Sequence, residues 1–297
     1  MSMICIFRDK FHPIIGGVET HISSLLESMP RRNFLVLTNR LPNTPKEEQY
    51  LPNSRIVRLG PVSNDFVPYR NRMLGRGLFP FRMLKDVIRI ERKLKYLKNN
   101  PFDIVHVHGI DISQNLFRFN YMMAQDIFSP FSWVGKIRNH KLLTVHGLDS
   151  IYSDNNFFKK YEKRAIMQFN NIVCVDEYIY QHVTKWVSSE RNKQVWYVPN
   201  AIDTDLFRPI HNGLINNSQL NAGLVCRNDV LHGIEIAAQL THVLPENIKL
   251  NIAMAATREE INNFKLKCNP KNVNVVENVE QSKMPEFINS QDIMLNL

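Results

Sequence analysis

The chain has 297 residues, of which 44% are hydrophobic and 22% charged, a composition typical of globular proteins with room for about two domains. No apolar run reaches the roughly 18–20 residues of a membrane-spanning helix. The first residues, MSMICIFRDK, lack the pattern of a signal peptide, so we expect a cytoplasmic protein. The four cysteines are scattered, which indicates reduced thiols and excludes a disulfide framework or a paired-cysteine metal site.

Short apolar runs alternate with helical patterns along most of the chain. The expected strands are 3–7, 34–38, 56–59, 104–108, 142–146, 172–175 and 195–198. Helical spacing of apolar residues falls between several of them, notably over 18–29, 82–98 and 157–169. This alternation predicts an α/β fold with a parallel sheet covered on both faces, whose ligands bind beyond the carboxyl ends of the strands.

A polar stretch at 208–221, RPIHNGLINNSQLN, is typical of a linker and separates two predicted Rossmann-like domains. Residues 1–207 would form the first, and residues 222–297 a smaller, incomplete second one. In the second, the expected strands are 222–226, 249–254, 272–276 and 292–297, with helices near 233–244, 257–267 and 283–289. The sequence stops within the last of these strands.

Two adjacent glycines, Gly16 and Gly17, lie between the first strand and the first helix, in FHPIIGGVETHISSLL. Backbone N–H groups at a helix start are unpaired, and glycine allows another molecule to approach them closely. A turn that needs unusual dihedral angles explains the pair equally well. The spacing differs from G-x-G-x-x-G, which argues against a nicotinamide cofactor.

Histidines stand at the ends of two expected strands. His106 and His108 project from one face of IVHVH, a spacing that could hold a metal, but the sequence offers no evident third ligand. His146 ends the next strand and precedes a glycine. It could face a ligand or bond a neighbouring loop.

A candidate phosphate site follows the first strand of the second domain, in CRNDVLHGIEIAAQL. Arg227 stands at the strand end, and His232 and Gly233 open the following helix. A cation beside a helix that begins at a glycine suits a phosphate. The simpler interpretation is that Arg227 lies in a loop and is exposed to solvent.

The net charge of +9 is concentrated between positions 70 and 98, which hold ten Lys and Arg against two acidic residues. The segment also carries leucines and phenylalanines, a combination that suits an anionic membrane surface. An ordinary helix with one apolar face is the alternative. A nucleic-acid partner is not expected, because no recognised binding motif occurs.

Taken in order, these pieces resemble the GT-B retaining glycosyltransferases of family 4. HPIIGGVETHISSL resembles the glycine-rich loop of that family, and DIVHVHG and LLTVHGLDS resemble its two histidine-bearing strand ends. IVCVDEYI stands where the family usually reads IVxVSE, WYVPNAIDTDLFRP is similar to IPNGVDxxxFxP, and CRNDVLHG occupies the place of GRLxxxKG.

The resemblance implies that residues 1–207 form the acceptor-side domain and residues 222–297 a partial nucleotide-sugar-binding domain. It also implies roles for the residues at these positions. Gly16 and Gly17 would line the donor cleft, and His146 would contact the transferred sugar. Arg227 and His232 would face the diphosphate leaving group, whose charge fixed cations stabilise.

The donor side would further include His108, Asn200 and Gly233, and the family works without a bound metal or other cofactor. Two positions depart from its pattern: His232 replaces a lysine, and Asn200 is followed by alanine where the family has glycine. Relatives also continue beyond Leu297 into a proline–serine loop and a glutamate pair that hold sugar and ribose.

The function implied is transfer of a sugar from a nucleotide-diphosphate sugar, with retention, to a lipid-linked, glycan or small-molecule acceptor, with the basic segment on the inner face of a membrane. A second hypothesis is a catalytically inactive, truncated homologue that acts as a binding or regulatory subunit. A third is a sugar-nucleotide epimerase on the same architecture.

Overall fold

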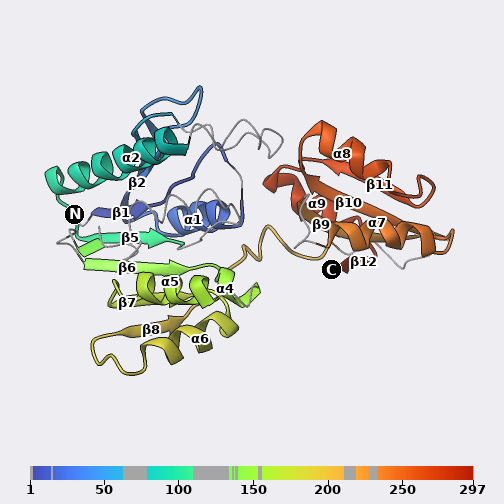
Figure 1. Cartoon of the computed structure of the whole chain (residues 1–297). Helices are drawn as coiled ribbons and strands as arrows, with labels where there is room; N and C mark the ends of the chain where they lie inside the picture. The colour runs from blue at the N-terminus through green and yellow to red at the C-terminus, as the bar shows by residue number, and fades with distance from the viewer. Residues whose placement is uncertain are drawn as a thin grey trace. The chain divides into compact units, whose positions relative to one another are not determined.

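The structure, a computed structural model, describes residues 3–14, 16–62, 79–109, 134–135, 137, 140–152, 156–210, 219–227 and 233–296. The chain divides into two compact units, Met1–Ala201 and Ile202–Leu297. Figure 1 colours the first unit from blue to yellow and the second from orange to red.

The first unit is built on a sheet whose eight strands, within the described residues, follow the order β3-β4-β2-β1-β5-β6-β7-β8. Neighbouring strands are parallel except for β3 and β4. The strands are β1 (Met3–Phe7), β2 (Asn33–Asn39), β3 (Glu47–Leu51), β4 (Ser54–Leu59), β5 (Ile104–His108), β6 (His140–Val145), β7 (Asn171–Cys174) and β8 (Gln194–Tyr197). The helices are α1 (Gly17–Ser28), α2 (Phe79–Asn99), α4 (Asp149–Tyr152), α5 (Asn156–Ile166) and α6 (Glu177–Val187).

Both faces of this sheet are buried under helices. Ile6 of β1 packs with Ile22 and Leu26 of α1 in one hydrophobic core. Its neighbours Cys5 and Phe7 lie in a second core, because successive side chains of a strand point to opposite faces. The predicted α/β fold with a covered parallel sheet is confirmed.

The order of the strands places a switch point beside β1. From β1 the chain continues to β2 on one side, and it later returns to the other side of β1 with β5. In open α/β sheets, ligands bind beyond the carboxyl ends of the strands at such a point. Helix α1 begins there, shortly after β1 ends (Figure 1).

The second unit repeats the plan on a smaller scale, with four parallel strands in the order β11-β10-β9-β12 among the residues described. They are β9 (Leu220–Arg227), β10 (Ile248–Ala255), β11 (Val273–Glu277) and β12 (Ile293–Leu295). Its helices are α7 (Ile234–Val243), α8 (Arg258–Lys265), the 3-10 helix η4 (Gln281–Lys283) and α9 (Met284–Asn289). Of the predicted linker, residues 211–218 lie outside the described residues.

Three elements of the first unit have no counterpart in the sequence analysis, namely β3, α6 and the short helix α4. Strand β3, EEQYL, is an antiparallel edge strand without an apolar run. Helix α6 is amphipathic and buries four side chains, although it follows β7 after only two residues. No helix in the described part of the chain is both long and apolar enough to cross a membrane.

Candidate functional site

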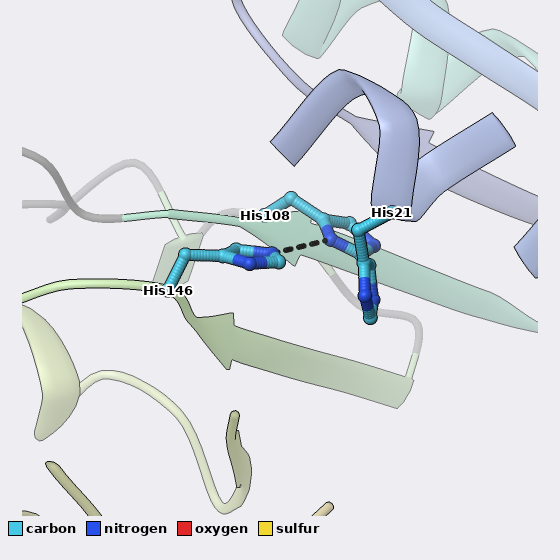
Figure 2. A group of neighbouring side chains, drawn as sticks. All are labelled: His21, His108 and His146. Atoms are coloured by element: carbon cyan, nitrogen blue, oxygen red, sulfur yellow. Dashed lines mark hydrogen bonds between the residues drawn. The ribbon is translucent and has the colours of Figure 1, made fainter. Parts of the chain in front are cut away.

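Three histidines meet in the first unit, two at the carboxyl ends of neighbouring strands and one near the start of α1. His108 is the last residue of β5, His146 directly follows β6, and His21 lies in the second turn of α1. Figure 2 shows their rings gathered around one point. His108 Nδ1 and His146 Nε2 share a hydrogen bond of 3.1 Å, and the ring centroids of His21 and His146 are 4.9 Å apart. We call these three residues the histidine cluster.

His106 supports the cluster from beneath. It lies two residues before His108 on β5, and the two ring centroids are 4.0 Å apart, so the expectation that both project from one face of the strand is confirmed. His106 Nε2 is 2.7 Å from Thr144 Oγ1 on β6. The hydrogen bond ties β5 to β6 directly below the cluster.

Arg8, which directly follows β1, links α1 to β5, two of the three elements that carry the cluster. Its guanidinium donates to the backbone oxygen of His108 at 3.0 Å and to Glu19 Oε1 on α1 at 3.3 Å. Sequence reasoning misses Arg8, Glu19 and His21. The sequence gives one clue to these residues, which is their position. Arg8 directly follows β1, and Glu19 and His21 lie in the first two turns of α1.

The imidazoles are held in their neutral form. Burial lowers the pKa of His146 to about 3 and the pKa of His106 to about 3. Burial lowers the pKa of His108 well below 6.5, and positive charge on neighbouring histidines and Arg8 adds to this effect. Burial also lowers the pKa of His21, against a hydrogen bond with the Asn200 side chain. At neutral pH the cluster therefore offers uncharged donors and acceptors.

One ring nitrogen of the cluster has no partner among the described residues. His108 is 1% exposed, and its Nε2 atom is buried without a hydrogen bond. An unsatisfied buried polar group costs about 1–3 kcal/mol. An unpaired buried group of this kind needs an explanation, and a hydrogen bond from the His108 ring to a bound molecule would supply one.

The two glycines before α1 do not serve an unusual dihedral angle. Gly16 is buried in extended backbone with φ −163°, and Gly17 is not among the residues with positive φ. A Cβ added to Gly17 would meet nothing within 4 Å. The turn interpretation of the pair is therefore wrong, and Gly17 stands in open space.

Helix α1 also begins without a capping side chain. Gly16 at its N-cap supplies no side-chain hydrogen bond, whereas α6 is capped by Asp176 and α8 by Thr257. The N–H groups at the start of α1 thus face the switch point with their positive dipole end uncapped by a side chain.

The second unit has a similar glycine-led helix start. Gly233 is the N-cap of α7, with φ 65° and no capping side chain, and a left-handed conformation of this kind favours glycine. Arg227 ends β9, as predicted, although its side chain is not described. His232 lies outside the described residues.

The sequence-predicted residues therefore fall into two groups. His108, His146, Gly16 and Gly17 lie on or beside the elements that meet at the switch point of the first unit, and Asn200 joins them through its hydrogen bond with His21. The remaining candidates belong to the second unit. Most of the basic segment is undescribed: residues 63–78 and the side chains of 79–87 and 90 lie outside the described set.

Solved structures with this fold are glycosyltransferases. The chain aligns with the catalytic domain of starch synthase IV from Arabidopsis thaliana, bound to ADP and acarbose, at 11% identity and a TM-score of 0.60, covering 99% of this chain and 78% of that one. It aligns with HepE from Anabaena in complex with UDP and glucose at 10% identity and a TM-score of 0.61, covering 99% and 73%. A UDP-forming trehalose-phosphate synthase from Burkholderia xenovorans matches at 12% identity and a TM-score of 0.55, covering 99% and 77%. No curated protein sequence matches the chain significantly.

The fold is that of the GT-B glycosyltransferases, with two Rossmann-like units. Residues 15–206 match the family described as Glycosyltransferase Family 4. The chain belongs to this family, and the resemblance read from its motifs is confirmed.

Burial of neutral histidines makes stability depend on pH. An unfolded histidine titrates near 6.5, whereas His106 titrates near 3 when folded. Between these values the unfolded chain binds more protons, so the free energy of unfolding falls as pH falls below about 6.5. His106→Gln should reduce this slope by about 1.4 kcal/mol per pH unit, measured by urea unfolding between pH 7 and pH 4. An unchanged slope would contradict the neutral state of His106.

The open space at Gly17 predicts a mild effect of a side chain there. Gly17→Ala should change the free energy of unfolding by less than about 1 kcal/mol, because alanine suits a helix and meets no neighbour. Gly60→Ala is the matched control: its φ is +88°, and its Cβ would lie 2.5 Å from Arg89 Cγ. It should lose roughly 2 kcal/mol or more. Equal losses in urea unfolding would show that Gly17 is needed by the fold itself.

Proposed function

We propose that the chain transfers a sugar from a nucleotide-diphosphate sugar to an acceptor, with retention of the anomeric configuration. The observation that carries the proposal is a neutral, half-buried His146 held by His108 beside the open, glycine-led start of α1. Family membership supports it, as do the nucleotides ADP and UDP in the structures with this fold.

In this proposal the first unit binds the donor sugar. His146 exchanges a hydrogen bond with a hydroxyl of the transferred sugar, and a neutral imidazole suits an uncharged hydroxyl. Gly16 and Gly17 allow the donor to approach the N–H groups at the start of α1. His108 orients His146 through the 3.1 Å hydrogen bond, and Asn200 lies next to them through His21.

The second unit would hold the diphosphate. Arg227, His232 and the start of α7 after Gly233 supply positive charge or N–H groups for the departing anion. The bond from the anomeric carbon to the diphosphate oxygen breaks, and a bond to the acceptor oxygen forms on the same face. The leaving phosphate takes the acceptor's proton. No resident metal takes part in these steps.

For the acceptor we propose a lipid-linked molecule reached at an anionic membrane surface through segment 70–98. The excess of ten basic over two acidic residues and the apolar side chains in this segment support the proposal. Binding to vesicles that contain an anionic phospholipid should weaken with added salt, and it should weaken further in the double variant Leu78→Ser, Phe79→Ser. Equal sedimentation with neutral and anionic vesicles would contradict the proposal.

The function is tested by incubating the full chain with UDP-, GDP- and ADP-sugars and candidate acceptors, in the presence of EDTA. We expect a glycoside with the donor's anomeric configuration, identified by proton NMR, and a rate that EDTA does not reduce. A product of inverted configuration would contradict retention. Conversion of the free nucleotide sugar without an acceptor would indicate an epimerase.

Arg227→Ala supplies the matching binding measurement. Loss of a charge-assisted hydrogen bond should weaken nucleoside diphosphate binding by about 1.5–3 kcal/mol in calorimetry. Arg258→Ala, at the first residue of α8 in the same unit, should bind as the parent does. Unchanged affinity in a folded Arg227→Ala variant would remove Arg227 from the site. Tight nucleotide binding without any turnover would instead indicate a binding subunit.

A further inference from the structure

The histidine cluster has the composition of a metal site, although the sequence shows no evident third ligand beside His106 and His108. His21, His108 and His146 each offer one ring nitrogen, and these three atoms lie within 4.8 Å of one another. They form the one such group of His, Cys, Asp and Glu among the described residues. His106 takes no part, because its Nε2 is bonded to Thr144.

The distances within the cluster are close to those of a coordinated ion. Two nitrogens bound to tetrahedral zinc at 2.0–2.1 Å are roughly 3.4 Å apart, and His108 Nδ1 and His146 Nε2 are 3.1 Å apart. His21 on α1 offers the third ring nitrogen, within 4.8 Å of the other two. Figure 2 shows the His21 ring beside the other two, and its centroid is 4.9 Å from that of His146 and 5.6 Å from that of His108.

The charges around the cluster select the kind of ion. The Arg8 guanidinium lies near His108 and His146, and its charge is offset by Glu19 at 3.3 Å. The candidate metal ligands are therefore the ring nitrogens, because the Glu19 carboxylate is already paired with Arg8. Hard cations such as Mg²⁺ and Ca²⁺ require oxygen ligands, whereas neutral imidazoles suit Zn²⁺, Cu²⁺, Ni²⁺ and Co²⁺.

From this geometry we infer that His21, His108 and His146 form a three-histidine site for Zn²⁺ or a similar transition-metal ion, with its fourth coordination position open. An ion bound there breaks the His108–His146 hydrogen bond that orients His146, and it places a positive charge beside the nitrogen that His146 presents to the sugar. Zinc therefore inhibits glycosyl transfer by competing with the donor sugar. The inhibition rests on the proposed function, whereas the binding of zinc does not.

Zinc binding is measured first, without any assay of transfer. The full chain, with any affinity tag removed, is titrated with Zn²⁺ against a chromophoric chelator, and Co²⁺ serves as a spectroscopic probe. We expect one tightly bound ion per chain, cobalt absorption bands typical of nitrogen ligands, and no competition from millimolar Mg²⁺.

Variants locate the ion. His21→Ala should weaken zinc binding at least tenfold, and so should His146→Ala. The control is His182→Ala, a half-buried histidine on α6 outside the cluster, which should bind zinc as the parent does. Circular dichroism checks that each variant is folded. Zinc binding that is equal in the parent and in folded His21→Ala would overturn the site, and so would the absence of one bound ion per chain.

Inhibition separates this inference from the proposed function. Zinc should raise the KM for the donor, and His21→Ala should require at least tenfold more zinc for the same fractional inhibition, relative to its own zinc-free rate. Transfer that proceeds without zinc binding overturns the metal site and leaves the proposed function intact. Zinc bound at the cluster without any effect on transfer overturns the role of His146 in donor binding and leaves the metal site intact.

Discussion

The Arg8 guanidinium fixes the arrangement on which the candidate site depends. It follows β1 directly, and it bonds both the carbonyl at the end of β5 and Glu19 in the first turn of α1. Arg8 and Glu19 are 14% and 10% exposed. Breaking such a pair leaves a poorly solvated charge behind, which costs several kcal/mol. The start of α1 is therefore held against β5, and this contact brings His21, one turn further along, to His108 and His146.

The electrostatics of the first unit suit a sugar better than a phosphate. Burial and the charge of Arg8 keep the imidazoles neutral, so they cannot balance a diphosphate. Among the described residues of the first unit, the uncapped start of α1 is one feature that suits an anion. In the proposed reaction the departing diphosphate calls for formal cations as well, and Arg227 is the candidate that the sequence offers.

The sequence predicts the strands well, because buried parallel strands are short continuous apolar runs. The expected bounds of β1 and β5, 3–7 and 104–108, are those of the structure. The sequence does not reveal β3, because this edge strand has no continuous run of apolar side chains. His21 is missed for a different reason: on a helix of mixed composition, its meeting with His108 depends on the tertiary position of α1. Whether Gly16 and Gly17 serve an unusual dihedral angle could be decided only by the structure, since a two-residue motif does not determine backbone dihedral angles.

The hydrogen bond between His108 and His146 also determines what His146 presents to a ligand. Two neutral imidazoles share one proton across this bond, so each ring's other nitrogen takes the opposite character. If His146 donates, the buried Nε2 of His108 carries an N–H without an acceptor, close to the positive charge of Arg8. If His108 Nδ1 donates, Nε2 keeps a lone pair, which that charge favours. The second arrangement is the more stable, and it leaves an N–H on the other nitrogen of His146. His146 is thus poised as a neutral donor, able to bond a sugar oxygen without bringing a charge into the site.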